Sequence, residues 1–252
     1  MGAPQMIARV DLNADVGEGM RGDAELLEVV TSANIACGLH AGNGETMTRT
    51  VELCMARNVA IGAHPSFDDR AGFGRREMDL PHEEVAALVQ RQLEALAGIV
   101  RAAGTRLRHV KPHGALYNQA GRDASLARAI ATAVHAFDRD LLLVGLAGGA
   151  LLAAGRAAGL RVASEVFADR GYRADGSLVP RSLPEAVIED EAVVVGRALG
   201  MVRSGTVRSV DGAEIAIDVQ TVCVHGDTPG AVGLARALRD ALREAGISVD
   251  AA

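Results

Sequence analysis

Hydrophobic positions along the chain follow two spacings that alternate from one end to the other. Short apolar runs, some with a polar residue at every second position, predict strands, whereas apolar residues three and four apart predict helices. The clearest helix is predicted over residues 81–103, where Pro81 suits the first turn. Its apolar stripe consists of Val85, Leu88, Val89, Leu93, Leu96 and Val100.

The same reading gives a regular order of elements. Strands are predicted at residues 6–12, 32–37, 59–63, 106–111, 141–146, 161–166 and 218–224. Further helices are predicted at residues 23–30, 45–57, 123–136, 149–158, 188–202 and 230–245. A hairpin is expected in GTVRSVDGAEIAI, with Asp211 and Gly212 as its turn. Such alternation predicts a mostly parallel α/β sheet, open or closed.

Polar residues at the strand ends favour the closed form. Six of the seven predicted strands run at their carboxyl ends into reactive side chains: Asp11, Asn13 and Asp15; His40; His64; Lys111 and His113; Asp169 and Arg170; His225 and Asp227. These ends meet at one mouth in a barrel but stay apart in an open sheet. We therefore expect a (β/α) barrel-like fold with about seven parallel strands, and residues 1–252 as a single domain.

Composition and charge exclude several classes of partner. The chain has a net charge of -6 and only 2% aromatic residues, which argues against nucleic acid and an anionic membrane surface as partners. Its longest uncharged run, residues 141–155, is shorter than the ~20 residues of a membrane helix. The amino terminus lacks the apolar core of a signal peptide, and three separated cysteines suggest no disulfide framework. We expect a cytoplasmic protein.

The first βα turn contains G-x-G-x-x-G, formed by Gly17, Gly19 and Gly22. This spacing is found in dinucleotide-binding turns, where glycines let the backbone approach a pyrophosphate. Here, however, Asp15 and Glu18 lie inside or beside the loop, and carboxylates disfavour an anion there. The acid expected about 20 residues further on is also missing. The glycines instead indicate a tight turn that presents carboxylates.

Further candidates follow the third and fourth strands. His64 precedes a proline in AHPSFDDRAGFGR, where it is either a turn residue or part of a site. Lys111 and His113 are two residues apart, so they share a side of an extended segment. At a barrel mouth such a pair can polarise a carbonyl and transfer a proton; on an open surface it is unremarkable.

Two later segments, and the aspartates and histidines at the strand ends, each allow more than one interpretation. Residues 165–182 form either a solvated connection or a lid whose arginines, among them Arg170 and Arg181, grip a carboxylate or phosphate. After the last strand, His225 is a candidate substrate contact. Aspartate and histidine at strand ends also suit a divalent metal, but no H-x-x-x-H or H-x-H spacing identifies its ligands.

Long segments resemble the LamB/YcsF family over nearly the whole chain: DLNADVGEG, SANIACGLHAG, VAIGAHPSFDDRAGFGR, RHVKPHGALYNQ, EVFADRGYRADGSLVPRS and QTVCVHGD. The resemblance implies a barrel related to the polysaccharide-deacetylase fold. It also implies ATP-dependent opening of 5-oxo-L-proline (pyroglutamate) to L-glutamate, together with two other 5-oxoprolinase subunits. The chain has no G-x-x-x-x-G-K-[ST] loop, so we expect ATP with Mg²⁺ to bind on, or together with, those partners.

A lactam substrate gives the candidate residues expected roles. Either Asp11 or Asp15 acts as the general base, while Lys111 and His113 stabilise developing charge or protonate the ring nitrogen. The expected substrate-binding residues are Asn13, His40, His64, Asp169, Arg170, Arg181 and His225. Two alternatives stay open: a metal-dependent, deacetylase-like amidohydrolase acting without ATP, and a non-catalytic subunit that binds the lactam.

Overall fold

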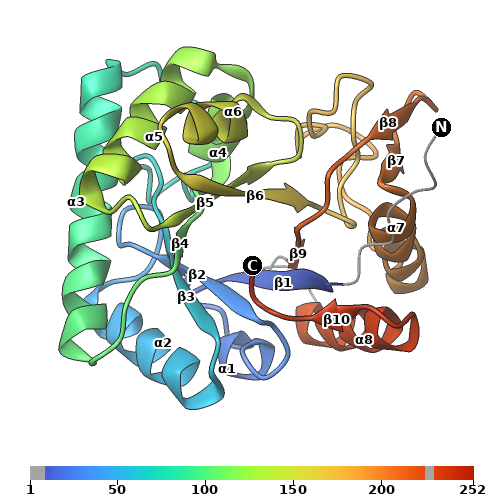
Figure 1. Cartoon of the computed structure of the whole chain (residues 1–252), viewed down its shortest axis with the longest axis horizontal. Helices are drawn as coiled ribbons and strands as arrows, with labels where there is room; N and C mark the ends of the chain where they lie inside the picture. Colours follow the sequence, from blue (N-terminus) through green and yellow to red (C-terminus); the bar gives the residue numbers. More distant parts are fainter. Residues whose placement is uncertain (1–8, 225–229) are drawn as a thin grey trace.

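The strands of the computed structural model, which describes residues 9–224 and 230–252, close into a parallel barrel (Figure 1). Around the barrel the order is β1 (Arg9–Val16), β2 (Ser32–Ala36), β3 (Ala60–His64), β4 (His109–Val110), β5 (Leu142–Leu146), β6 (Arg161–Val166) and β9 (Thr221–Val224). Strand β9 pairs with both β6 and β1, which completes the ring. The predicted seven-stranded parallel barrel is confirmed.

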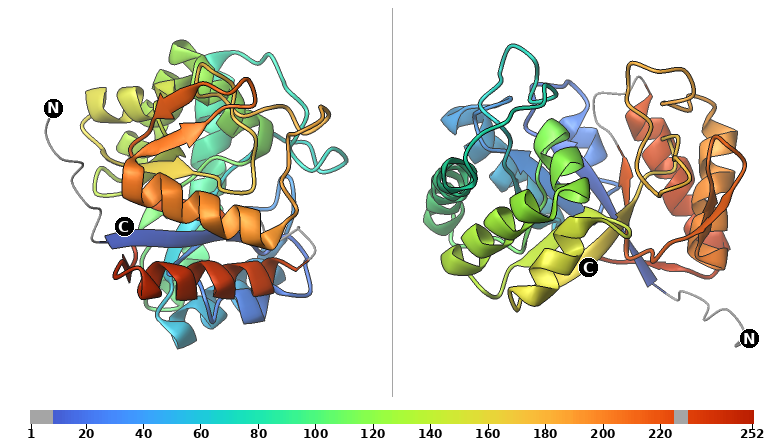
Figure 2. Two further views of the ribbon diagram at one scale, coloured as in Figure 1. Left: turned by 90° about the vertical axis from the view of Figure 1, so that its right-hand side faces the viewer. Right: turned by 90° about the horizontal axis from the view of Figure 1, so that it is seen from above.

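Helices surround this barrel on its outer face (Figure 1). They are α1 (Asp23–Leu26), α2 (Gly44–Arg57), α3 (His82–Ala102), α4 (Gly114–Arg122), α5 (Ala124–Phe137), α6 (Ala150–Ala157), α7 (Glu191–Ser204) and α8 (Ala231–Glu244). Helix α3 packs on α2 and α5, and α8 packs on α7 and α1. Both views of Figure 2 show α7 and α8 side by side, on the opposite side of the barrel from α3.

The alternation of apolar and polar residues along β1 explains which side chains fill the interior of the barrel. Val10, Leu12 and Ala14 belong to the apolar core, whereas Asp11 and Asn13 make hydrogen bonds with side chains of neighbouring strands. Successive side chains of a strand point to opposite faces, so one face packs on helices and the other lines the interior. Strand β1 continues to Val16, beyond the predicted end at residue 12.

Polar side chains link the interior of the barrel from one end to the other. The Thr221 hydroxyl donates to Asp11 Oδ2 at 2.6 Å and accepts from Asn13 Nδ2 at 2.6 Å. Asn13 Nδ2 also donates to Glu165 Oε1 at 2.9 Å, and Asn34 Nδ2 donates to Asn13 Oδ1 at 2.7 Å. This polar column replaces the branched aliphatic filling usual in (β/α) barrels.

Smaller elements confirm some predictions and correct others. Strands β7 (Thr206–Arg208) and β8 (Glu214–Ala216) form the predicted hairpin, and Gly212 in its turn has φ +85°. Helix α4 and the short strand β10 (Ser248–Val249), which pairs with the start of β1, were not predicted. Within residues 9–224 and 230–252, no helix is long and apolar enough to cross a membrane.

Candidate active site

A cavity of about 580 Å³ opens at the carboxyl ends of the strands, and we refer to it as the mouth. Asp15, Glu18, His64, Lys111 and His113 line it. Further lining residues are Arg75, Arg173 and Arg181, which are exposed. Its volume lies in the range typical of small-molecule sites. The mouth is therefore the candidate active site.

The glycine turn after β1 presents Glu18 to the mouth. Gly17 and Gly19 have φ of +73° and +88°, a backbone conformation that residues with a side chain rarely adopt. The Gly17 N–H donates to Asp23 Oδ2 at 2.8 Å, which fixes the turn against α1. The expected tight turn that presents carboxylates is confirmed.

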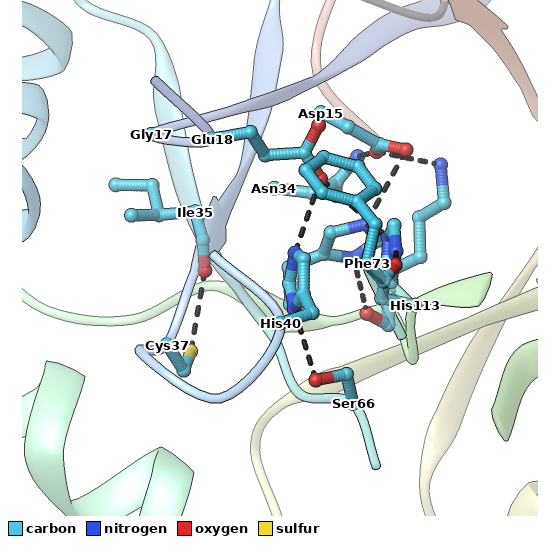
Figure 3. A network of polar contacts seen from close by, with 12 residues as sticks. Asp15, Gly17, Glu18, Asn34, Ile35, Cys37, His40, Ser66, Phe73 and His113 are labelled. Atoms are coloured by element: carbon cyan, nitrogen blue, oxygen red, sulfur yellow. Dashed lines mark hydrogen bonds and ion pairs between the residues drawn. The ribbon is translucent and has the colours of Figure 1, made fainter. Parts of the chain in front are cut away.

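His40 lies in the loop after β2 and stacks on His113, with ring centroids 3.8 Å apart (Figure 3). Its Nδ1 lies 2.9 Å from Ser66 Oγ, and its Nε2 lies 3.1 Å from Glu18 Oε1. Burial, together with neighbouring His64, lowers the pKa of His40 to about 3. The ring is therefore neutral at physiological pH.

His64 contacts the stacked ring of His113 edge to face, with ring centroids 4.8 Å apart. His64 Nδ1 donates to the Lys111 carbonyl at 2.7 Å, and His113 Nε2 donates to the Phe73 carbonyl at 2.8 Å. The other two nitrogens, His64 Nε2 and His113 Nδ1, are 3.0 Å apart. Burial and the adjacent His64 and His40 hold the pKa of His113 well below its ordinary value. The predicted site histidines His40, His64 and His113 therefore lie in one buried cluster.

Lys111 occupies the base of the mouth rather than its open part. Its ammonium lies 3.0 Å from Asp15 Oδ1 and 2.8 Å from Glu165 Oε1, and its side chain is only 2% exposed. It also contacts Asn13 Oδ1 at 3.2 Å and Cys223 Sγ at 3.0 Å. Burial opposes its charge, but the two carboxylates raise the pKa of Lys111 well above its ordinary value. Lys111 is thus a buried cation that orients Asp15 and Glu165.

The loop between β3 and α3 packs against the histidine cluster and accepts a hydrogen bond from it. Phe73 has φ +54°, an uncommon conformation for a residue with a side chain, and its carbonyl accepts from His113. A Cβ on Gly74 would lie 2.8 Å from His113 Cδ2, so the backbone packs directly on the ring. The loop is braced by Asp69, which accepts from the Gly72 N–H and from Arg76. Hydrogen bonding from Arg76 lowers the pKa of Asp69 to about 2.

The arginines of the predicted lid divide into two kinds. Arg170 is buried and donates through Nε to the Ala186 carbonyl at 2.8 Å and through Nη2 to the Val179 carbonyl at 2.6 Å. Burial, with Arg181 nearby, lowers the pKa of Arg170 to about 10. Arg170 thus fastens the segment after β6 and, although buried, lines the mouth; Arg181 lines the mouth as well and is exposed. Asp169 is buried in the same segment and is not among the lining residues.

The expectation that Asp11 shares the mouth is wrong. Asp11 lines a second cavity, at the amino ends of the strands, together with Arg106 and Arg161; we call this the floor. Its carboxylate accepts hydrogen bonds from Thr31 and Ser32 at 2.7 Å each, in addition to Thr221. The physical reason is the length of β1, since Asp11 is the third residue of a strand that continues to Val16.

Asn13 also lies below the mouth, where it lines the floor together with Asp11. Its Oδ1 accepts from Lys111, so it positions that ammonium instead of lining the open cavity. His225 falls outside the described residues. Of the predicted site residues, Asp15, His40, His64, Lys111 and His113 come together, and Arg170 and Arg181 line the same cavity.

Sequence reasoning gave no role to three residues that complete the site. Glu18 was identified as a carboxylate of the turn, but its contact with His40 depends on the fold. Glu165 points into the barrel because it occupies an inward position of β6, which strand alternation can reveal. Tyr117 lies on the unpredicted helix α4, and burial together with Glu165 raises its pKa well above its ordinary value.

Two overlapping sets of side chains can supply metal ligands. The ligand atoms of Asp15, His64 and His113 lie within 4.8 Å of one another, as do those of Glu18, His40 and His113. Imidazole nitrogens and carboxylate oxygens are common ligands of zinc and related divalent ions.

Comparisons with known proteins agree with the sequence resemblance. The model of the LamB/YcsF family matches residues 10–252. A protein of Methylococcus capsulatus (strain ATCC 33009 / NCIMB 11132 / Bath), named as the A subunit of 5-oxoprolinase, is 56% identical over 251 residues, which cover 98% of this chain and 96% of that protein. The crystal structure of a lactam utilization protein from Thermus thermophilus is 48% identical, with a TM-score of 0.90, and the match covers 97% of this chain and 100% of that one.

A more distant likeness concerns the fold alone. The polysaccharide deacetylase Bc1974 from Bacillus cereus is 13% identical, with a TM-score of 0.50, and the match covers 98% of this chain and 92% of that one. The expected relation to the polysaccharide-deacetylase fold is thereby confirmed.

Proposed function

The chain belongs to the LamB/YcsF family, and from this premise we propose that it is the lactam-binding, ring-opening subunit of an ATP-dependent 5-oxoprolinase. Its substrate in this proposal is 5-oxo-L-proline, and the product is L-glutamate. Two similar proteins, named as the A subunit of 5-oxoprolinase and as a lactam utilization protein, support a lactam as the substrate class.

The observation that carries the proposal is the division of charge across the mouth. Acceptor groups of Asp15, Glu18, His64 and His113 gather at its base, and the exposed arginines line it as well. A 5-oxoproline molecule offers an amide N–H that suits acceptors and a carboxylate that suits a guanidinium. We assign Arg181 to the carboxylate and the acceptor cluster to the amide and the attacking water.

Opening the ring adds one water across the C–N bond. The hydroxyl joins the carbonyl carbon, the ring nitrogen leaves with a proton, and the product carries a new carboxyl group and an amine, which ionise to a carboxylate and an ammonium. A carboxylate at the base of the mouth takes the proton from the water and returns it to the nitrogen. Of the two there, Asp15 is held through Oδ1 by Lys111 and by Asn34 Nδ2 at 2.9 Å. We assign the proton transfer to Glu18, whose Oε1 lies 3.1 Å from His40 Nε2 at the mouth, and the variant Glu18→Gln tests this choice.

ATP chemistry is assigned to the assembled enzyme rather than to this chain alone. An unstrained lactam is a stable amide, so its opening requires coupling to an energy source. The sequence has no phosphate-binding P-loop, and its G-x-G-x-x-G turn carries Glu18. In this proposal ATP and Mg²⁺ bind with two partner subunits of the B and C types, and the lactam binds here.

The test compares the purified chain with the assembled complex. Each is assayed with 5-oxo-L-proline, ATP and Mg²⁺ for glutamate and ADP. We expect no ATP-coupled glutamate from the lone chain and coupled turnover from the complex. ATP-coupled turnover by the lone chain would overturn the division of labour, and ATP-independent amide cleavage would favour the deacetylase-like alternative.

A second arm separates catalysis from simple binding. Glu18→Gln in the complex is expected to lower turnover about 100-fold or more, the usual cost of losing a positioned acid–base group. Unchanged complex turnover together with retained lactam binding would instead identify this chain as a carrier of substrate. The exposed helical residue Glu94→Gln is the matched control, expected to keep full turnover.

A further inference from the structure

The hydrogen bonds of His64 and His113 determine which of their nitrogens face each other. A backbone carbonyl only accepts, so His64 carries its proton on Nδ1, next to the Lys111 carbonyl, and His113 carries its proton on Nε2, next to the Phe73 carbonyl. The nitrogens left over, His64 Nε2 and His113 Nδ1, then both present a lone pair. These two lone pairs meet at 3.0 Å.

Negative oxygens surround the same point. Asp15 Oδ2 lies 3.3 Å from His64 Nε2, and Glu18 Oε1 lies 3.5 Å from His113 Nδ1. All four side chains are at most 10% exposed, so water screens their charges only weakly. One proton shared by the two rings would satisfy a single contact, whereas a divalent cation attracts both nitrogens and both carboxylates.

We propose that Asp15, His64 and His113 bind one divalent metal ion at the base of the mouth, with Glu18 beside it. Two imidazole nitrogens and one carboxylate favour zinc or a first-row transition ion such as Mn²⁺ or Co²⁺ over Mg²⁺. The site is expected to leave part of the ion's coordination sphere open toward the cavity. The inference concerns ion binding by this chain and does not depend on the substrate proposed above.

Groups behind the ligands hold them in place. Each ligating ring donates its outer N–H to a backbone carbonyl, an arrangement that fixes the tautomer and the ring orientation. Asp15 Oδ1 accepts from Lys111 and Asn34, which directs Oδ2 toward His64. The ligand positions are therefore set before an ion arrives.

The stoichiometry follows from the shared histidine. The second set of ligand atoms, from Glu18, His40 and His113, uses the same residue as the first. The single lone pair on His113 Nδ1 can coordinate one ion at a time. We therefore expect one ion per chain at this cluster, not two.

Calorimetry on the untagged full chain tests the proposal. The protein is stripped with a chelator, dialysed and titrated separately with Zn²⁺, Mn²⁺ and Mg²⁺, without substrate or ATP. We expect about one equivalent of Zn²⁺ or Mn²⁺ to bind, and Mg²⁺ to bind far more weakly. Co²⁺ should give visible d–d absorption bands that report nitrogen and oxygen ligands.

Variants locate the ion. His113→Ala and His64→Gln are expected to weaken binding on the order of 100-fold or more, since even groups behind the ligands contribute 10- to 100-fold. The control is His135→Ala, an exposed histidine of α5 that should bind like wild type. Thermal melts establish that each metal-free variant is folded, and His64→Gln retains a similar volume in case the alanine variant does not fold.

The outcomes are decisive in both directions. A folded, stripped chain that binds neither Zn²⁺, Mn²⁺ nor Co²⁺ overturns the proposal, and so does equal binding by His113→Ala and His135→Ala. An inactive assembled enzyme would contradict the proposed function and leave this result untouched. Metal binding lost in both cluster variants but kept in the control supports the site whichever reaction the chain serves.

Discussion

A cavity opens at each end of the barrel, and the two are nearly equal in size, about 580 Å³ at the mouth and about 620 Å³ at the floor. Both contain aspartate, histidine and arginine. At the floor, the Asp11 carboxylate accepts from three hydroxyls, and His109 Nε2 donates to Asn34 Oδ1 at 2.8 Å. At the mouth, the lone pairs of His64 and His113 face each other.

This difference shows that residue types and cavity volume do not by themselves identify a site. Acceptors at the floor are matched with donors from the protein, so the polar groups there stabilise the interior. At the mouth, two histidine nitrogens that carry lone pairs face each other beside the carboxylates of Asp15 and Glu18, so that end is suited to receive a donor or a cation from outside.

The largest effect is expected from Lys111→Met. Removing the ammonium leaves the buried carboxylates of Asp15 and Glu165 without their cation, which typically costs about 3–5 kcal/mol in the free energy of unfolding. Turnover of the assembled enzyme should fall about 100-fold or more, because Asp15 loses its orientation. Urea denaturation and steady-state assays measure the two effects.

A double variant separates stability from catalysis in that experiment. Adding Glu165→Gln to Lys111→Met removes one uncompensated charge, so we expect part of the stability to return while turnover stays low. A Lys111→Met protein as stable as wild type would show that the ammonium does not hold the two carboxylates, and would contradict the buried-cation interpretation.

The second effect is on packing in the barrel interior. Gly62 pairs with His109 across β3 and β4, and a Cβ at Gly62 would overlap the imidazole ring. Gly62→Ala should therefore lower the free energy of unfolding by about 1–3 kcal/mol, the usual range for overpacking. The matched control is Gly98→Ala in α3, where a Cβ meets nothing within 4 Å and should stabilise by up to about 1 kcal/mol. Equal stability of the two alanine variants would contradict the prediction.

Much of the fold was predictable because the barrel satisfies the local patterns of its chain. The predicted strand 161–166 is β6 itself, and the helix predicted at 81–103 differs from α3 by one residue at each end. Helix α4 was missed because it begins immediately after His113, at the end of a segment that sequence analysis interpreted as extended. Strand β10 has only two residues, too few to show a period.

The site was only partly predictable for a reason that β1 illustrates. Aspartate and asparagine are depleted in strands, so the polar positions of β1 were interpreted as lying at or beyond its end. In fact Asp11, Asn13 and Asp15 line successive depths of a polar barrel, and Asp15 alone reaches the mouth. Contacts between distant segments, such as Glu18 with His40, require the fold and leave no local signal.

The third prediction concerns Asp11 at the floor. Burial raises the pKa of Asp11 above its ordinary value, although hydrogen bonds from Thr221, Thr31 and Ser32 oppose the shift. A folded-state pKa above the unfolded value gives stability that is complete below about pH 3.9 and is lost as the pH rises through the folded-state pKa. The stability of wild type relative to Asp11→Asn should therefore decline as the pH rises through the folded-state pKa of Asp11.

Denaturation of both proteins at several pH values between 4 and 8 measures that difference. Turnover of Asp11→Asn should stay near wild type, because Asp11 does not line the mouth. A loss of turnover comparable to that of Lys111→Met would make Asp11 a catalytic residue after all, and would remove the functional distinction between the two ends.

The smallest effect is expected at the rim of the mouth, where Arg181 is exposed to solvent. Interactions of an exposed charge are typically worth about 0.2–1 kcal/mol, so Arg181→Ala should weaken binding of 5-oxo-L-proline by about 1.5- to 5-fold. Arg181→Lys retains the charge and should lose less affinity, and raising the salt concentration should reduce the difference between the variants, because ions screen exposed charges. Calorimetric titration of the chain with 5-oxo-L-proline at low and high salt measures both effects. Unchanged affinity in Arg181→Ala would assign the substrate carboxylate to another group, and Arg173, which also lines the mouth, would be the next to test.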